Sequence, residues 1–516
     1  MACLAGCTPW SQYVRNGFRV GPNYARPPAP VARDWIDAKD DSLATDALSV
    51  RRSSDDLSAW WTVLDDPVLD ALVQRAAREN LTVRQAGFRV LEARAQLAIA
   101  KGNLFPQVQQ AVGDYSRNKI SESVTNQEAS PKKWFSLWDA GFNLAWELDF
   151  WGQFMRAVES AAADLDASVE NYDDVLVTLL ADVATAYVRI RTLENRITVA
   201  ERNVKDQKRL LEVARAKFKG ELVSEIAPDQ AEVTLRQTQA LIPSLKIQQR
   251  QAENQLCILL GLPPREVSKE QGFATAAGRI PQAPAEVAVG IPADLLRRRP
   301  DVRRAERQAA SQCAQIGVAT AELYPHIAVT GTIGLQAEYF PHLFDGSKPM
   351  VGSVGPSFHW NILNYGRLQN NIHVQDARFL QLVTNYQNTV LKANAEVENA
   401  LVAFLRSQER AGYLGKGTVA ARKGLKVAEV NFQNDKVDFV AVALLEENLA
   451  QQEDDWAQAQ GDVALGLIQL YRALGGGWQI RLGAGQQSAA AEPPAAPRPE
   501  TIRTPPVEEA PAVIAP

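Results

Sequence analysis

The histidines are the first residues that could carry catalytic chemistry. They are His326, His342, His359 and His373. They form no HExxH metal motif and have no clear partners for an acid–base triad. The segment Gly352-Ser353-Val354-Gly355 does not complete the nucleophile elbow of hydrolases. The triple glycine at 475–477 lacks the downstream lysine of a phosphate loop and is expected to end a helix. We therefore expect no enzymatic activity, no cofactor and no metal site.

Cysteine is the second candidate for chemistry. The four cysteines are Cys3, Cys7, Cys257 and Cys313. They form no CxxC pair, which argues against a disulfide framework and against a zinc site. The tetrad Leu4-Ala5-Gly6-Cys7 matches the end of a bacterial lipoprotein signal, although the usual basic start and apolar stretch are missing. By itself the tetrad leaves open either an acylated cysteine behind a start codon placed too late or a chance cysteine.

Length and charge limit the possible classes of protein. The chain has 516 residues, 46% of them hydrophobic, and a net charge of −5, which gives no reason to expect nucleic acid as a partner. No run of eighteen apolar residues occurs, so the sequence predicts no transmembrane helix.

The helices that these residues predict are unusually long. From Gln153 to Phe218 there is neither glycine nor proline, and apolar residues recur every three or four positions. Further uninterrupted runs extend over 367–411 and 425–460. Patterns longer than about 25 residues indicate a coiled coil or a helical repeat. A rod-like structural coiled coil in the periplasm is one interpretation that these patterns leave open.

The chain contains an internal tandem duplication. Aligning Trp146 with Trp360 places Gly152 on Gly366 without a gap. Farther upstream, NLFP at 103–106 aligns with ELYP at 322–325. Each copy is predicted to contain a helix ended by proline, two strands and two long helices.

The strand segments alternate between apolar and polar residues. In LWDAGFNLAWELDF the even positions include Phe142, Leu144 and Trp146, and in the second copy they include Phe358 and Trp360. This period fits an ordinary sheet packed on a core, or transmembrane β-strands whose apolar side chains face lipid. Because membrane barrels begin at about eight strands and an eight-stranded barrel is filled by its side chains, four strands per chain require three or more copies for a channel.

The sequence resembles the TolC-like outer-membrane efflux proteins, in particular their lipoprotein branch, the NodT or OprM-like proteins. The motifs are VGPNYARPPAP (20–30), WWTVLDDPVLDALVQRA (60–76), FRVLEARAQLAIAKGNLFPQV (88–108), ELDFWGQ (147–153), LLGLPP (259–264), IPADLLRRRPDVRRAE (291–306) and ALGGGW (473–478). The resemblance implies a mainly α protein with transmembrane β-strands: a homotrimeric helical tunnel on a shared twelve-stranded barrel.

The resemblance also implies function and partners. The chain is expected to be the outer-membrane channel of a tripartite efflux pump, with a periplasmic adaptor, an inner-membrane RND-type transporter and outer-membrane lipid as partners. A channel of a type I secretion system is the alternative of the same kind. Members of this branch begin with an acylated cysteine shortly before VGPxYxRP, so Cys7, thirteen residues before Val20, is the expected palmitate site.

The resemblance places the periplasmic gate in the helix–turn–helix at 431–448. Asp438 occupies the position of one gate aspartate, whereas Leu444 replaces a second and Asp435 replaces the turn glycine. A ring of Asp435 and Asp438 carboxylates is expected to favour cations. The glycines at 412, 415 and 417 are expected to break the helix.

The expected organisation of the chain follows from these segments. Residues 1–7 are a signal remnant, 8–65 an extended segment, 66–265 the first repeat, 266–290 a connection, 291–478 the second repeat and 479–516 a disordered Ala/Pro-rich tail.

Overall fold

The protein is described from a computed structural model. The structure describes residues 10–31, 35–36, 49–51, 57–121, 134–269, 273, 278–284, 286–288, 298–434 and 436–482. The chain divides into two units, Met1–Trp478 and Gln479–Pro516, and the elements discussed below belong to the first. Cys7 and Asp435 lie outside the described residues.

The order of elements repeats along the chain. After the short helix α1 (Trp10–Arg15), the strand β1 (Ser49–Arg51) and the helix α2 (Pro67–Glu79), the first copy contains α3 (Leu81–Gly102), β2 (Val108–Lys119), β3 (Trp134–Leu148), α4 (Gln153–Lys219) and α5 (Ile226–Leu259). After β4 (Glu286–Ala288), the second copy contains α8 (Pro300–Ala321), β5 (His326–Ala337), β6 (Met350–His359), α9 (Arg367–Gln433) and α10 (Phe439–Ala473). Both copies therefore have the predicted order of helix, two strands and two helices.

Equivalent residues play equivalent parts in the two copies. Gly152 before α4 and Gly366 before α9 both have positive φ angles, of 77° and 79°, which glycine adopts without strain. The indole of Trp146 donates to the Leu104 carbonyl at 3.2 Å, and the indole of Trp360 donates to the Leu323 carbonyl at 3.0 Å. Each tryptophan thus fastens the base of its strand pair to the turn that follows the preceding helix.

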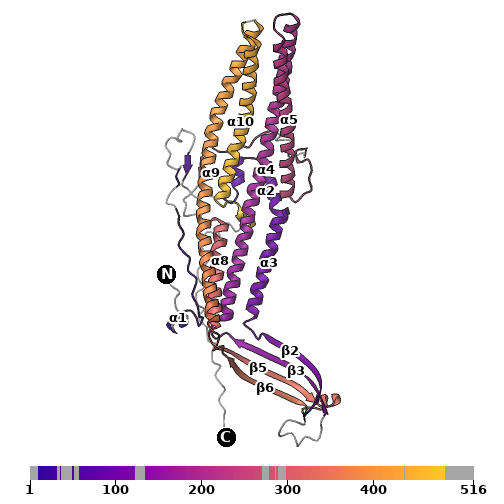
Figure 1. Ribbon diagram of the computed structural model, residues 1–516, viewed down its shortest axis with the longest axis vertical. Helices are drawn as coiled ribbons and strands as arrows, with labels where there is room; N and C mark the ends of the chain where they lie inside the picture. The colour runs from indigo at the N-terminus through magenta and orange to yellow at the C-terminus, as the bar shows by residue number, and fades with distance from the viewer. Residues whose placement is uncertain are drawn as a thin grey trace, which may run out of the picture. The chain divides into compact units, whose positions relative to one another are not determined.

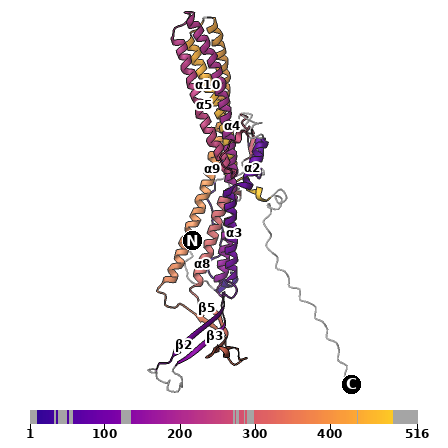
Figure 2. The ribbon, with the colours of Figure 1, turned by 90° about the vertical axis from the view of Figure 1, so that its right-hand side faces the viewer.

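The four long strands form one antiparallel sheet in the order β2-β3-β5-β6. The helices follow the same order, because α3 packs on α4, α4 on α8, and α8 on α9 (Figure 1). Both views show the strands continuing from the ends of these helices (Figure 2). Within the described residues, β2 and β6 are the unpaired edges of the sheet, and α3 and α9 stand at the two ends of the helical layer. The segment before Ile36 lies along α9, because Gln387 donates to the Pro28 carbonyl and the Ile36 N–H donates to Glu398.

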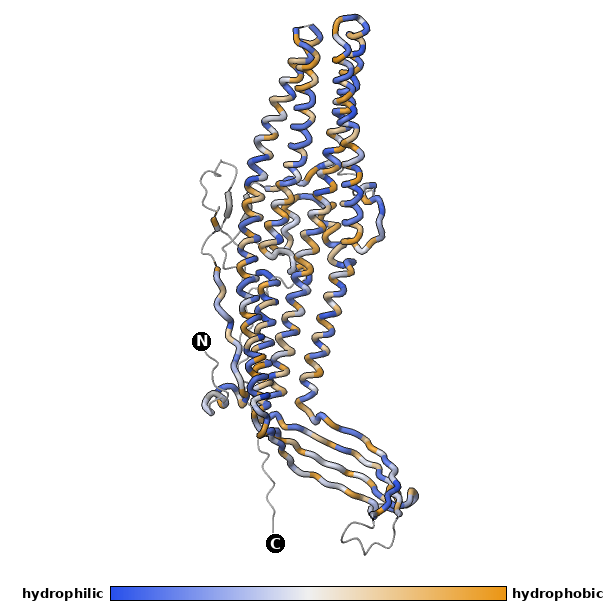
Figure 3. The backbone as a smooth tube through the Cα atoms, viewed as in Figure 1, coloured by the Kyte–Doolittle hydropathy of each residue, from blue (hydrophilic) through white to orange (hydrophobic). Residues whose placement is uncertain are grey.

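At the opposite end, α4 pairs with α5 and α9 pairs with α10, which makes two helical hairpins. Residues of all four helices form a common apolar cluster that joins the hairpins, including Leu211, Leu235, Phe432 and Phe439. Among the described residues, no helix is long and apolar enough to cross a membrane. In Figure 3 every long helix mixes hydrophilic and hydrophobic residues along its length.

Two predictions about the helices were wrong. The helix α9 runs unbroken from Arg367 to Gln433, through all three glycines that were expected to break it. A Cβ on Gly415 would lie 3.1 Å from the Trp456 ring nitrogen, and one on Gly417 would lie 3.1 Å from the Gln452 side chain. Gly415 and Gly417 therefore leave room for side chains of α10 and do not end α9. The second wrong prediction is the single helical run over 425–460. In the structure this range contains the turn between α9 and α10.

The predicted end of the fourth strand was also wrong. β6 ends at His359, so Trp360 lies just beyond it. The strand ends there because its partner β5 begins at His326, which pairs with His359.

Candidate functional site

Sequence motifs that are far apart along the chain meet at one junction between the helices. Trp60, of the WWTVLDD motif, stacks on Tyr471 near the end of α10, with ring centroids 5.4 Å apart. The guanidinium of Arg303, of the RPDVRRAE motif, lies 4.6 Å from the ring centroid of Trp478, of the ALGGGW motif. Three of the motifs on which the resemblance rests thus meet in one packed region of the fold.

The triple glycine allows this close packing. A Cβ on Gly475 would lie 3.1 Å from the Arg299 Cα, and a Cβ on Gly477 would lie 2.7 Å from a methyl carbon of Leu180. Both glycines also have positive φ angles, 74° and 100°. The glycines therefore end α10, as expected, and also let the chain contact α4 and the start of α8.

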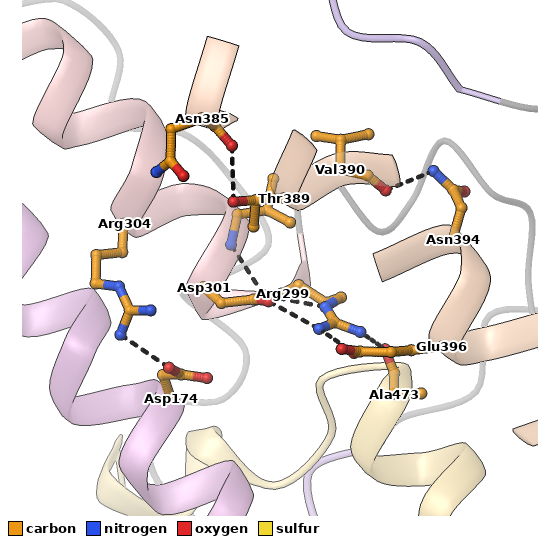
Figure 4. Close-up of polar contacts among 11 residues, drawn as sticks. Asp174, Arg299, Asp301, Arg304, Asn385, Thr389, Val390, Asn394, Glu396 and Ala473 are labelled. Carbon is orange, nitrogen blue, oxygen red and sulfur yellow. Dashed lines mark hydrogen bonds and ion pairs between the residues drawn. The ribbon is translucent and has the colours of Figure 1, made fainter. Parts of the chain in front are cut away.

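Arg299 is the centre of the polar contacts at this junction (Figure 4). Its guanidinium donates to both carboxylate oxygens of Asp301, at 3.0 and 2.7 Å, and to Glu396 on α9 at 2.6 Å. It also donates to the carbonyl of Ala473 at 2.8 Å, which satisfies one of the orphan carbonyls in the last turn of α10. One buried side chain therefore joins α8, α9 and α10.

A cavity of about 680 Å³ adjoins Arg299. Its other arginines are paired: Arg304 donates to Asp174 at 2.9 Å, and Arg472 lies 3.6 Å from Asp182. Burial raises the pKa of the Asp174 and Asp182 carboxyl groups, and the neighbouring arginines oppose that rise. Because the arginines are matched by carboxylates, this junction braces the helices and offers no excess charge to a ligand.

The predicted gate lies in the turn between α9 and α10. Asp438 occupies the N-cap position of α10, but its side chain makes no capping hydrogen bond within the described residues. Leu444 is 60% exposed on α10. Beside this turn, the Lys217 ammonium on α4 donates to the Phe432 carbonyl on α9 at 2.7 Å, which links the two hairpins.

One face of the sheet gathers apolar side chains. The register places Phe142 between Ala111 and Ile333, and Leu144 beside Gly331, which in turn pairs with Val354. Phe142 and Phe358 are 66% and 75% exposed. The strands that carry Phe142, Leu144, Trp146 and Phe358 are therefore as predicted, and their contact with lipid stays a prediction.

The other face of the sheet is polar. Asn143, Thr332 and Ser353 are neighbours across three strands, and the hydroxyl groups of Thr332 and Ser353 lie 3.1 Å apart. At the base of this face, His326 Nδ1 lies 2.5 Å from a Glu147 oxygen, and the His326 ring stacks on His359 at 4.7 Å. Sequence reasoning missed this cluster, because only the strand register shows that His326 and His359 are cross-strand partners.

Histidine, cysteine and carboxylate side chains are the groups that could hold a metal ion. The described part of the chain contains no group of three or more His, Cys, Asp or Glu side chains placed to hold a metal ion. The two cysteines that the structure describes, Cys257 and Cys313, are buried and unbridged.

Comparison with known proteins identifies the family. The model of the family described as "Outer membrane efflux protein" matches residues 72–262 and 291–476. The Nodulation protein T of Rhizobium leguminosarum bv. trifolii is 29% identical, over 87% of this chain and 94% of its own length. The pyoverdine export outer membrane protein OpmQ of Pseudomonas putida is also 29% identical, over 81% of this chain and 88% of its own length.

A solved structure leads to the same family. The outer-membrane channel OprN superposes with a TM-score of 0.80 and 29% identity, over 89% of this chain and 99% of that one. The resemblance to the TolC-like, OprM/NodT-like proteins is thereby confirmed, and the chain belongs to the outer membrane efflux protein family.

Proposed function

We propose that three copies of this chain assemble into the outer-membrane channel of a tripartite efflux pump. As a member of its family the chain is an outer-membrane efflux protein and has no catalytic role of its own. The number of copies, the barrel that they share, the lipid anchor and the partner proteins are the parts that this proposal adds.

The observation that carries the proposal is that the sheet has two unpaired strand edges. β2 and β6 each lack a neighbour on one side within the described sheet, and α3 and α9 stand at the matching edges of the helical layer. An unpaired strand edge offers free N–H and C=O groups, which in lipid are too costly to leave unsatisfied. Joining the β6 edge of one copy to the β2 edge of the next satisfies both, and repetition of this contact closes a ring.

The edge helices support the same contact because both expose apolar side chains. These residues are Leu81, Phe88, Leu91 and Ile99 on α3 and Val374, Leu380 and Leu391 on α9. Burying one such side chain contributes about 1.5–3 kcal/mol. With four strands per copy, three copies give twelve strands, which is above the roughly eight strands at which side chains fill the interior.

The two faces of the sheet fit the two sides of such a barrel. The exposed Phe142, Leu144 and Phe358 would contact lipid, with Trp146 and Trp360 near the base of the strands. The opposite face, with Asn143, Thr332 and Ser353, would line the water-filled interior. Transmembrane barrels require one apolar and one polar face of the sheet. A purely helical periplasmic scaffold does not require such a sheet.

A lipid anchor at Cys7 completes the membrane attachment in this proposal. Its support is the Leu4-Ala5-Gly6-Cys7 tetrad and its position shortly before the VGPNYARP segment. Acylation of this cysteine would hold the segment that leads to Val20 at the membrane. Val20 is itself bound to the base of the fold, because its N–H donates to the Trp151 carbonyl at 3.0 Å.

The hairpin ends are the proposed site of the periplasmic opening. There the chain would meet a periplasmic adaptor and an inner-membrane RND-type transporter. Asp438, together with Asp435, would place carboxylates near the threefold axis and favour cations. Like charges at close range repel, so closure depends on contacts between the hairpins, such as that of Lys217 with Phe432.

Native mass spectrometry of the detergent-extracted protein tests the assembly. We expect the mass of three chains for the wild type and for Phe88→Leu, which keeps an apolar contact at the α3 edge. Phe88→Glu should release monomers, because it puts a charge into the proposed contact. A wild type that is monomeric in mild detergent would overturn the proposal.

A further inference from the structure

We propose that Glu446 is a proton-operated latch between the two helical hairpins, a device that rests on the channel function proposed above. Glu446 lies on α10, seven residues after its first residue, Phe439. It is beside the apolar cluster that joins the hairpins, which contains Phe432, Phe439 and Val442. Its charge can therefore act directly on the contact that holds the hairpins together.

The side chain of Glu446 faces a cavity of about 510 Å³ between α4, α9 and α10. The residue is only 9% exposed. It makes no hydrogen bond or ion pair with any residue that the structure describes. A carboxyl group that is buried without a partner is stable in its neutral form and costly in its charged form.

Charged groups reach this cavity from every element that forms it. They are Arg202, Asp206 and Arg209 on α4, Arg422, Lys426 and Glu429 on α9, and Glu453 on α10. The helix α5 contributes no residue to the described lining. Two of the basic groups, Arg202 and Arg422, pair with Glu453.

The distribution of these charges separates Glu446 from Glu453, one heptad farther along α10. Glu453 lies 2.5 Å from the guanidinium groups of both Arg202 and Arg422 and is therefore an ion-paired carboxylate. Glu446 is instead faced by Glu429 and Asp206. Burial, followed by these two carboxylates, raises the pKa of Glu446 to about 8. The pKa of Glu429 is also raised, mainly by burial and secondarily by Asp206.

The sign of the pH effect follows from this upward shift. Because the pKa of Glu446 is higher in the packed state, its protonated form stabilises the packing of the hairpins. This stabilisation is complete at pH values below the ordinary pKa of a glutamate. This contribution is lost as the pH rises towards about 8. At neutral pH Glu446 keeps its proton and the hairpins pack. When the proton leaves, the charged carboxylate of Glu446 is costly to keep buried beside Glu429 and Asp206. Water that enters to solvate it separates the hairpins.

The proton is the ligand that this site best accommodates. No metal-holding group of three or more His, Cys, Asp or Glu side chains occurs among the residues that the structure describes. Arg209 and Lys426 also line the cavity and would repel an added cation. The latch therefore senses pH and needs no further ligand.

A distance measurement between the hairpin turns tests the latch without relying on conductance. Spin labels are placed on cysteines introduced at Leu222, after α4, and at Val437, before α10. In this background Cys257 and Cys313 are replaced, and the proposed anchor Cys7 is kept. Labelled chains are diluted with unlabelled ones, and electron–electron resonance distances are recorded from pH 6 to pH 9. We expect the distance to lengthen in the wild type as the pH rises towards about 8. Native mass spectra of the same samples report assembly separately.

Two variants complete the test. Glu446→Gln keeps the shape but cannot ionise, so its distance should stay at the low-pH value up to pH 9. Glu447→Gln, one residue away and exposed, should behave like the wild type. A flat wild-type profile, or a Glu446→Gln profile that moves as the wild type does, would overturn the latch. Either result would leave the trimeric channel unaffected.

Discussion

Replacing Arg299 by glutamine should loosen the junction where α8, α9 and α10 meet. The guanidinium makes four hydrogen bonds, to Asp301, Glu396 and the Ala473 carbonyl, and the residue is 7% exposed. Glutamine removes the charge and the planar fork of donors. The carbonyl of Ala473 then loses the Arg299 donor in a buried setting, and the carboxylate of Asp301 keeps only the hydrogen bond from the Val302 N–H.

The expected magnitude follows from these contacts. Breaking a buried ion pair by removing one partner costs about 3–5 kcal/mol. An orphaned buried carbonyl costs about 1–3 kcal/mol, and this overlaps with the first value because both describe the same loss of partners. Glu396 is more than half exposed and can turn to water. We therefore expect a loss of about 3–5 kcal/mol at this junction.

Hydrogen exchange measures this loss locally. Since about 1.4 kcal/mol corresponds to a tenfold change in an equilibrium constant, amide protection should fall by roughly two to three and a half orders of magnitude. The fall should appear in the last turn of α10 and the first turn of α8. Arg304→Gln, in the same cavity, is the matched control: its pair with Asp174 is about one-third exposed, so its effect should stay within about fivefold. Equal effects of the two substitutions would refute the central role of Arg299.

Three other predictions concern separate parts of the molecule. Gly466→Ala should lower the thermal unfolding temperature, because its Cβ would lie 3.0 Å from the Phe404 Cα. The control Gly424→Ala places its Cβ in open space and should stabilise the helix by about 1 kcal/mol. A higher unfolding temperature for Gly466→Ala would contradict this packing. Replacing Asp435 and Asp438 together by alanine should lower cation selectivity in planar bilayers at low salt, and an unchanged reversal potential would show that these residues do not line the pore. Cys7→Ala should abolish palmitate labelling; label that persists in this variant would refute the anchor.

Periodic patterns allowed much of the fold to be predicted from the sequence. The apolar positions of α4 recur over many turns, and those of β3 alternate, so the type of each element follows from local spacing. The repeat was also visible, because Gly152 and Gly366 each precede a long helix where a positive φ is needed. Such requirements are local and act on the residue type itself.

Features that depend on another element could not be predicted. The continuity of α9 through Gly415 depends on Trp456 of α10, which occupies the space that a side chain at this glycine would fill. The partners of Arg299 come from three helices, and His326 meets His359 only through the strand register. The burial of Glu446 likewise depends on α4 and α9. In each case the sequence contains the residue, but the fold supplies its neighbours.

A cryo-electron microscopy reconstruction of the purified protein in lipid nanodiscs tests the central claim most directly. We predict threefold symmetry, with β6 of each copy hydrogen-bonded to β2 of the next and the apolar side chains of Phe142 and Phe358 directed towards lipid. A particle in which the edges of β2 and β6 remain unpaired, or in which Phe142 and Phe358 face an aqueous interior, would contradict the account.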